Sequence, residues 1–281
     1  MIKVFAIIVT YNPNLVQLKL QLDEICPQVA GCVYVDNGSE NRESLREFCS
    51  RLSKTTSWIL NHENAGIAKA QNQGIDKAKK MGATHILLLD QDSIPCSDMV
   101  KALSAPYMQY KNIGATGPVI VNAYTKSEEL FGIRISGLRI LHIPLTTELN
   151  DVSYIISSGC MIPIEVIDKV GGMNDDMFID GVDFEWCLRA RNYGYKILQC
   201  TSAKLIHELG NGNSDKVLSH SPNREYYIVR NSFKMSRMKH IPCLHRVRRF
   251  AMGVLRMLSS LRPGRMEYFK YALKGAIEGF F

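Results

Sequence analysis

Long apolar segments are scarce in this sequence of 281 residues, and none is long enough to cross a bilayer as a helix. The apolar run from Val4 to Val9 is stopped by Thr10 and is too short for the core of a signal peptide. The eight cysteines include no C-x-x-C pair, which excludes a zinc ribbon and a thioredoxin-type site and leaves reduced thiols as the expectation. We therefore expect a cytoplasmic protein that contacts the inner face of the plasma membrane at most peripherally.

Several nucleotide and metal motifs are also absent. The sequence has neither G-x-G-x-x-G nor G-x-x-x-x-G-K-[ST], so no dinucleotide fold and no P-loop are indicated. His207-Glu208 lacks the second histidine that a zinc protease motif requires. No basic glycine-rich loop follows the first apolar run, which disfavours nucleotidyl transfer onto a sugar phosphate, a second class of enzyme with an acidic nucleotide site.

Apolar residues make up 46% of the chain and charged residues 22%, which is enough for a full hydrophobic core. This length favours one large α/β domain with a smaller appendage. The net charge of +7 favours an anionic partner, which is nucleic acid, nucleotide phosphate or an acidic lipid surface. The positive excess gathers after about Ser221.

Apolar strands alternate with amphipathic helices over residues 3–90. The expected strands are 3–10, 32–36, 58–60 and 85–90, and the expected helices are 14–26, 42–52 and 67–82. Three strand–helix units that feed a fourth strand require right-handed crossovers and predict a parallel sheet. Weaker patterns predict strands at 113–121, 138–143 and 204–206, an exposed loop at 122–129, and helices ending at 193, spanning 221–239 and including 247–261.

Polar side chains follow each of the first four strands. They are Thr10, Tyr11 and Asn12; Asp36 and Asn37; Asn61 to Gly66; and Asp90, Gln91 and Asp92. Because carboxyl ends of parallel strands meet at one sheet edge, where open α/β sheets bind ligands, these groups predict a site. Asp90 and Asp92 can serve one ligand, one by cation contact and one by hydrogen bonding. Alone, the pair is equally typical of a turn and cap before a helix near Ser97.

Individual roles at this edge follow from the residue types. Asp36 can accept a hydrogen bond from a base imide, while Tyr11 stacks on or lines the base pocket. Gly66 allows close backbone approach at a helix start, where N–H groups favour phosphate.

Longer stretches of the sequence resemble the family 2 inverting glycosyltransferases of the GT-A fold, in particular their bacterial rhamnosyltransferase-like branch. The resemblance covers most of residues 1–235. The matching stretches are 9–12 (VTYN), 35–39 (VDNGS), 64–74 (NAGIAKAQNQG), 89–93 (LDQDS), 171–174 (GGMN), 178–189 (FIDGVDFEWCLR) and 207–210 (HELG).

This resemblance implies transfer of a sugar from a nucleotide diphosphate donor, dTDP-L-rhamnose, to a hydroxyl of a lipid-linked or oligosaccharide acceptor. Such transfer belongs to the synthesis of a cell-surface polysaccharide such as the lipopolysaccharide O-antigen. The donor-binding residues it implies are Thr10, Tyr11, Asn12, Asp36, Asn64, Gly66, Lys69, Asp90, Gln91 and Asp92. Galactofuranosyl or hexosyl donors are the alternatives, since sugar choice depends on pocket shape.

A second acidic cluster, made of Asp180, Asp183 and Glu185, contains the catalytic base that the resemblance implies. Inversion needs a base opposite the leaving diphosphate, and the matching motif places it on Asp183. The family often has an acid where this chain has Val182, which raises Asp180 as the substitute. Glu185 would hold acceptor hydroxyls or orient the site, and Trp186 either stacks on a sugar or packs in the core. Acids at a helix start are favourable for structure alone.

Three further residues are assigned with an alternative for each. Gly159 either brings backbone close to the acceptor or belongs to an ordinary Ser-Ser-Gly turn. His207 resembles the family's downstream metal ligand, and with Asp92 it would bind Mg²⁺ or Mn²⁺, although a lone histidine after a strand is often structural. Arg224 either reaches phosphate or solvates its helix.

The predicted division is a catalytic domain at 1–210 and a basic, helical region at 211–281. Its amphipathic helix has an apolar stripe, with arginines off the stripe. The stripe residues are Val247, Phe250, Ala251, Val254, Leu255, Leu258 and Leu261, and the arginines are Arg246, Arg248, Arg249 and Arg256. This helix docks on the catalytic domain, on a second copy in a homo-oligomer, or on anionic lipid.

A non-catalytic nucleic-acid or nucleotide-binding module is the remaining alternative. Against nucleic acid, the basic residues cluster in one terminal region, and the four strand ends are rich in acids and amides that would repel a phosphate backbone.

Overall fold

The first half of the central sheet is parallel, as the alternation of strands and helices predicts. In the computed structural model, which describes residues 1–50, 56–207, 221–262 and 264–281, β1 (Val4–Thr10) lies between β2 (Gly31–Asp36) and β4 (His85–Asp90). β3 (Thr56–Leu60) forms the edge beside β2. Thr10 pairs with Asp36 and Val9 with Asp90, so these strands end at one edge of the sheet.

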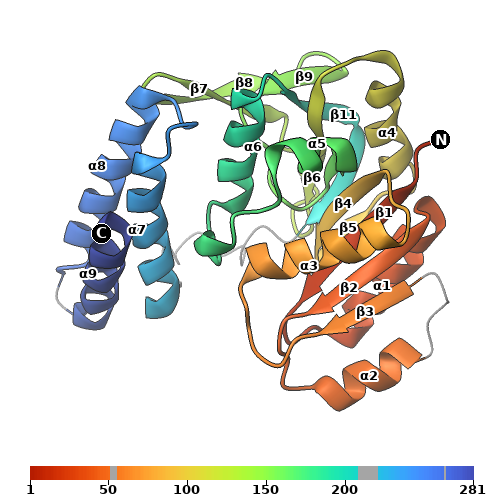
Figure 1. The fold of residues 1–281 in the computed structure, drawn as a ribbon, viewed down its shortest axis with the longest axis horizontal. Helices are drawn as coiled ribbons and strands as arrows, with labels where there is room; N and C mark the ends of the chain where they lie inside the picture. Colours follow the sequence, from red (N-terminus) through yellow and green to blue (C-terminus); the bar gives the residue numbers. More distant parts are fainter. Residues whose placement is uncertain (51–55, 208–220, 263) are drawn as a thin grey trace.

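Both faces of this half are covered by helices (Figure 1). Alternate residues of β1 face opposite ways, so Ile7 packs with α3 (Ile67–Lys80) while Ile8 packs with α1 (Leu15–Ile25). Both side chains are buried, and α2 (Arg42–Ser50) and α4 (Met99–Gln109) add to the α1 face. The predicted helix and strand limits are met within a few residues, and the predicted end of α2 lies outside the described residues.

The second half of the sheet is mixed, which the sequence analysis did not predict. β10 (Cys160–Pro163) runs antiparallel between β4 and β6 (Ile113–Asn122). β11 (Lys196–His207) is parallel to β6, and it is far longer than the three residues predicted at its end. β5 (Ser93–Pro95) pairs antiparallel with the end of β11. The last residues of β4 and β11 are thereby brought to the same edge.

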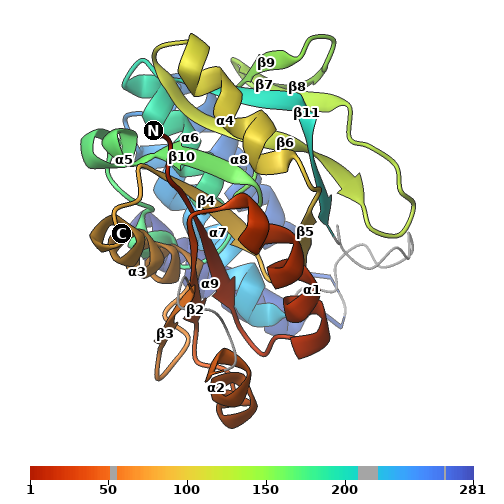
Figure 2. The same cartoon turned by 90° about the vertical axis from the view of Figure 1, so that its right-hand side faces the viewer.

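Smaller elements complete this part of the chain. β9 (Leu149–Val152) pairs with β11, and β7 (Phe131–Ser136) pairs with β8 (Arg139–Pro144) in a hairpin beside it (Figure 2). The remaining elements are α5 (Ile164–Val170), α6 (Val182–Asn192) and the short 3₁₀ turns η1 (Cys26–Gln28) and η2 (Asp175–Met177). The eight cysteines, all within the described ranges, are free thiols as expected.

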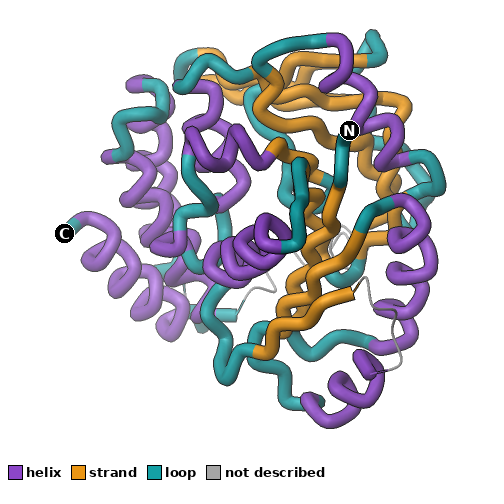
Figure 3. The backbone as a smooth tube through the Cα atoms, turned by 45° about the vertical axis from the view of Figure 1, so that its right-hand side comes forward, coloured by secondary structure: helices purple, strands orange, loops and turns teal. Residues whose placement is uncertain are grey.

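Three helices form a separate layer beside the sheet (Figures 1 and 3). They are α7 (Pro222–Arg237), α8 (Cys243–Ser259) and α9 (Met266–Phe280), of which α9 was not predicted. α9 lies directly on α7, because a Cβ on Gly275 would come within 2.4 Å of the Tyr226 carbonyl oxygen. The predicted domain boundary at residue 210 lies outside the described residues. No helix in the described ranges is both long and apolar enough to cross a membrane.

The orientation of α8 differs from the simplest expectation for an amphipathic helix. Its inner contacts are made by Gly253 and Val254 against Phe233 of α7, and by arginines that point toward the rest of the protein. Most of the predicted apolar stripe is solvent-exposed, with Leu255 65% exposed. α8 contacts the catalytic domain through His245 and Arg249, which lie against Phe184 of α6, so the helix docks there by its other face and not by the predicted stripe.

Candidate functional site

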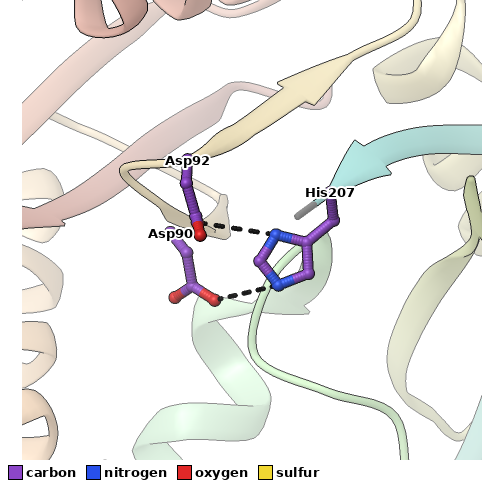
Figure 4. Close-up of side chains that lie close together, drawn as sticks. All are labelled: Asp90, Asp92 and His207. Atoms are coloured by element: carbon purple, nitrogen blue, oxygen red, sulfur yellow. Dashed lines mark ion pairs between the residues drawn. The ribbon is translucent and has the colours of Figure 1, made fainter. Parts of the chain in front are cut away.

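Three potential metal ligands meet at the edge where β4 and β11 end. Asp90 and Asp92 both lie on one side of the His207 ring, and ligand atoms of all three residues lie within 4.8 Å of one another (Figure 4). His207 Nδ1 is 3.5 Å from an Asp92 carboxylate oxygen, and Nε2 is 3.9 Å from an Asp90 oxygen. Asp92 and His207 were predicted as ligands. The structure adds Asp90, for which the sequence had predicted a donor contact.

Buried hydroxyls hold this cluster in place. Ser93 Oγ lies 2.9 Å from His207 Nδ1 and 2.5 Å from Ser158 Oγ, and the Asp90 backbone N–H donates to Ser158 Oγ at 3.3 Å. Gln21 of α1 donates from Nε2 to the backbone oxygens of Asp90 and Ser93, both at 2.6 Å. No sequence signal identified Gln21, because its role depends on how α1 packs against the β4–β5 turn.

The donor set suits a divalent cation. Two carboxylates and one imidazole offer the hard oxygen and borderline nitrogen ligands that Mg²⁺ and Mn²⁺ accept. Burial raises the pKa of Asp90 to about 6, opposed by His207 and reinforced by the carboxylates of Asp92 and Asp183. A cation would offset this repulsion, so the residues fit the metal that the sequence predicts.

Asp183 lies in the first turn of α6, near the metal cluster. Its Oδ1 accepts from the Phe184 backbone N–H at 2.8 Å and its Oδ2 from that of Ser157 at 3.3 Å. Burial raises the pKa of Asp183 above that of an ordinary carboxyl, and these hydrogen bonds oppose the shift. A carboxylate held in this way can act as a general base near neutral pH.

The turn at residues 157–159 joins the metal cluster to Asp183. The Ser157 backbone N–H donates to the Asp183 carboxylate, and Ser158 Oγ accepts from the Asp90 backbone N–H, so consecutive residues contact both halves of the site. Gly159 has φ +85° and donates its N–H to the Leu88 carbonyl at 2.8 Å. Gly159 is thus part of an ordinary turn, which is one of the two alternatives that the sequence predicted for it. The sequence did not reveal that this turn connects the two halves of the site.

The loop before α6 has strained backbone. Phe178 (φ +59°) and Asp180 (φ +65°) are in the left-handed region, followed by Gly181 at +86°. Buried Asn231 of α7 donates from Nδ2 to the backbone oxygens of Met177, Ile179 and Asp180 at 2.8, 2.7 and 2.9 Å. The C-terminal layer therefore fixes the conformation that leads into Asp183.

Arg224 pairs with Asp180 on this loop. Its Nη2 lies 2.8 Å from Asp180 Oδ1 and its Nε 3.1 Å from Oδ2, and this pairing raises the pKa of Arg224. Neither of the two predicted roles of Arg224, phosphate contact or helix solvation, describes this geometry. Asp180 is correspondingly engaged in an ion pair, whereas Asp183 has no basic partner within ion-pair distance in the described chain.

Glu185 and Trp186 point into the packing of α6. Glu185 is buried, with Arg189 Nε at 2.9 Å and His240 Nε2 at 2.8 Å, and these partners lower its pKa against the effect of burial. Trp186 is 1% exposed and donates its indole N–H to the Gly171 carbonyl at 2.9 Å. These contacts fit a structural role, so the predicted acceptor contacts of both residues have no support in this geometry.

The predicted donor residues near β1 and β2 form one hydrogen-bonded group. Asp36 is fully buried, and its carboxylate accepts from the side chain and backbone N–H of Ser39 and from Thr10 Oγ1. A bond from Asp36 to a nucleobase would require this turn to move. Tyr11 is 46% exposed, and its backbone exchanges hydrogen bonds with the Gln91 amide. The Asn12 N–H donates to Ser39 Oγ.

The start of α3 is less accessible than predicted. Gly66 has φ +84°, and a Cβ there would lie 2.6 Å from the Phe178 ring. The Ile67 N–H donates to the Phe178 carbonyl at 2.7 Å, so the close approach is to Phe178, where we expected phosphate. Asn64 Oδ1 accepts from Asn37 and from the Gly66 N–H. Lys69 is exposed on α3 and does not join this network.

The sequence is similar to known glycosyltransferases. Residues 85–280 match the family model described as "Glycosyl transferase family group 2". The chain is 35% identical to the dTDP-rhamnosyl transferase RfbF of Shigella flexneri over 98% of this chain and 95% of that protein.

Two solved structures share the fold at low sequence identity. The mannosyltransferase PcManGT of Pyrobaculum calidifontis, solved with GDP-Man and Mn²⁺, has a TM-score of 0.61 at 14% identity and covers 99% of this chain and 87% of that one. GalNAc-T7 with UDP, GalNAc and Mn²⁺ has a TM-score of 0.65 at 18% identity, covering 90% of this chain. The chain spans only 55% of the GalNAc-T7 structure.

Proposed function

Because the chain belongs to the glycosyl transferases of family group 2, we propose that it transfers L-rhamnose from dTDP-L-rhamnose to a hydroxyl of a glycan acceptor. The printed name of its 35% identical relative supports this donor. The GT-A fold expected from the sequence is confirmed by the solved structures. The acceptor is part of a cell-surface polysaccharide under assembly, such as the O-antigen.

One observation carries the proposal. A candidate cation site and the half-buried carboxylate of Asp183, which has no basic partner among the described residues, are positioned by consecutive residues of one turn, Ser157 and Ser158. Inverting transfer requires these two functions on opposite sides of one sugar. A nucleotide-binding module would have no use for Asp183 beside the cation site.

The residues of the site have separate roles in the proposed reaction. Asp90, Asp92 and His207 would hold Mg²⁺ or Mn²⁺, which supplies positive charge for the leaving nucleotide diphosphate. Asp183 accepts the proton of the acceptor hydroxyl as that oxygen attacks the anomeric carbon. Tyr11 would stack on the nucleobase, a role that its exposed side chain leaves open to it.

The assignment of the base is tested by Asp183→Asn. We expect this variant to bind dTDP and Mn²⁺ as the parent does, and to lose transfer by about 10²–10⁴-fold. Asp180→Asn is the matched control, because Asp180 is the alternative base and lies in the same loop. Loss of transfer in Asp180→Asn with unchanged transfer in Asp183→Asn would reverse the assignment.

Donor identity is tested with a panel of nucleotide sugars. dTDP-L-rhamnose, UDP-galactofuranose and UDP-glucose are supplied to the full chain with Mn²⁺, and release of nucleotide is measured. Cation-dependent release from dTDP-L-rhamnose above the others supports the proposal. Preference for another donor would keep the enzyme class and replace the sugar.

The outer face of the C-terminal layer supports peripheral contact with an anionic membrane. Leu255 of α8 and Phe281 after α9, which is 91% exposed, are two of many exposed apolar side chains on this layer. The others include Leu244, Val247, Leu258, Leu261, Leu273, Ile277 and Phe280. Residues 221–281 contain thirteen Lys and Arg against three Glu, so their net charge exceeds that of the whole chain. An apolar face with basic surroundings suits anionic lipid.

Liposome binding at low salt tests this contact. We expect Val247→Glu with Leu255→Glu to abolish sedimentation with anionic vesicles, because two charges would enter the apolar contact. Val16→Glu on α1, where Val16 is 72% exposed, is the control and should bind as the parent does. Equal binding by all three proteins would end the membrane proposal, and loss of a dimer in the double variant would identify a second copy as the occupant.

A further inference from the structure

The inner face of α8 brings two half-buried arginines, Arg248 and Arg249, to the neighbourhood of Asp183. The guanidinium carbon of Arg249 lies 4.6 Å from the centroid of the Phe184 ring, which follows Asp183 in α6. One Arg249 nitrogen is 3.2 Å from Met235 Sδ, and Nε is buried without a hydrogen-bond partner in the described chain. Arg248 Nε is likewise buried and unpartnered. Neither guanidinium forms an ion pair with any described residue.

His245 completes this group from the preceding turn of α8. It is fully buried, its ring centroid is 5.3 Å from that of Phe184, and neither ring nitrogen has a partner among the described residues. Burial, followed by the charges of Arg249 and Arg248, lowers the pKa of His245 to about 4. The imidazole is therefore neutral at pH 7 and offers one N–H donor.

Burial of positive charge without an ion pair is costly, because a desolvated guanidinium loses its hydration and no carboxylate at hydrogen-bond distance compensates for the loss. Burial lowers the pKa of Arg249 to about 10, which still leaves it charged at pH 7. Elsewhere in the C-terminal layer the same cost is avoided, since buried Glu225 binds Arg256 through two bonds of 2.8 and 2.9 Å. The Arg248, Arg249 and His245 side chains are thus suited to an anion that none of the described residues supplies.

The position of Arg248, Arg249 and His245 indicates that the bound anion belongs to the acceptor and not to the donor. The donor diphosphate belongs at the cation site of Asp90, Asp92 and His207, on the side of the sugar opposite the base. Asp183 is the carboxyl whose negative charge acts on Arg249, and the neutral phenol of Tyr154 lies in the same neighbourhood. Tyr154 packs edge-on against Phe184 at 4.9 Å and also lines a cavity of about 400 Å³ under the β7–β8 hairpin.

We propose that Arg248, Arg249 and His245 bind a phosphate group attached to the acceptor sugar, as in a glycan carried on a lipid diphosphate. This inference rests on the proposed glycosyl transfer and specifies its acceptor. The same helix then has two functions. Its outer face contacts lipid, and its inner face binds the phosphate that joins lipid to sugar.

Binding of decyl diphosphate to the full chain tests this site, with saturating dTDP and Mn²⁺ present to occupy the donor site. We expect Arg249→Met to weaken decyl diphosphate at least tenfold and Arg249→Lys to recover part of the loss. Arg262→Gln, an exposed change beyond α8, is the control and should bind as the parent does. Decyl glucoside, which has the same chain without charge, should bind Arg249→Met and parent equally.

Thermal unfolding separates this role from a structural one. Because Arg249 is half-buried without an ion-pair partner among the described residues, Arg249→Met should leave the ligand-free Tm unchanged or raise it. A lowered Tm with unchanged decyl diphosphate binding would make Arg249 structural and overturn the inference. Weaker dTDP binding in Arg249→Met would move the anion site to the donor, which also overturns it. Either result leaves the proposed function standing as long as the parent transfers sugar from its donor.

Discussion

Asn231 is the residue through which the C-terminal layer holds the catalytic loop, and its replacement by alanine gives a sharp prediction. Asn231 is buried, and its one amide group donates to three backbone oxygens, those of Met177, Ile179 and Asp180. Asn231→Ala leaves these acceptors without their donor. Each buried unsatisfied group costs about 1–3 kcal/mol, and sharing of one amide lowers the sum, so we expect a loss of roughly 2–4 kcal/mol.

The effect on catalysis should exceed the effect on folding. Phe178 and Asp180 hold left-handed backbone that costs about 1–2 kcal/mol each, and relaxation of the loop in the variant recovers part of this energy. That relaxation shifts the start of α6 and with it Asp183. Because a misplacement of about 1 Å can cost 10²-fold, kcat should fall by roughly 10–100-fold.

The assay combines urea unfolding with initial rates at saturating donor. Ser232→Ala is the matched control, since Ser232 is the next buried residue of α7 and its hydroxyl bonds, among the described residues, only to the Ile228 carbonyl of its own helix at 2.8 Å. Its loss should stay near 1 kcal/mol with kcat unchanged. If Asn231→Ala matched Ser232→Ala in both measurements, the loop would not depend on α7 and the reasoning would be refuted.

Outcomes are expected for three further substitutions and for removal of the cation. Ser93→Ala removes the hydroxyl that orients His207 and should raise the Mn²⁺ concentration for half-maximal activity by about 10–100-fold. Chelation by EDTA should abolish transfer in the parent, and activity that survives EDTA would exclude the cation from the mechanism. Because folding raises the pKa of Asp183, the folded chain binds the Asp183 proton more tightly than the unfolded chain, and stability falls as pH rises through the folded pKa. Asp183→Asn should therefore stabilise the protein more at pH 8 than at pH 4. A pH-independent effect in thermal melts would contradict the raised pKa. Gly66→Ala places a Cβ against the Phe178 ring at positive φ and should lower the free energy of unfolding in urea by about 1–3 kcal/mol. An unchanged free energy of unfolding would show that the start of α3 does not pack tightly against Phe178.

Features that depend on local sequence could be predicted. The strand ending at Asp90 was predicted to the residue, because an apolar run closed by acids specifies both a buried strand and its polar end. Asn14 caps α1 from the position where its sequence pattern begins. Asp92 and His207 were assigned to one site from motifs 115 residues apart in sequence, and the structure brings them together.

Features that depend on packing could not be predicted from the chain. Arg224 could not be assigned to Asp180, because an arginine on a helix has the same local pattern whether it faces solvent, phosphate or a loop. Glu185 and Trp186 follow Asp183 in the motif, yet successive helical residues point in different directions, and these two face the core. The outward orientation of the α8 stripe was missed because α9, which was not predicted, and α7 receive its other side.

The sequence by itself determined a parallel α/β half with acids at the carboxyl ends of its strands, since period, turn residues and strand order are encoded locally. The tertiary structure decided which of those polar groups face one another. These arrangements depend on contacts between distant segments: the turn at Ser157 and Ser158 that joins cation site to base, the Asn231 amide that fixes the loop, and Arg249 of α8, which packs against the Phe184 ring next to Asp183.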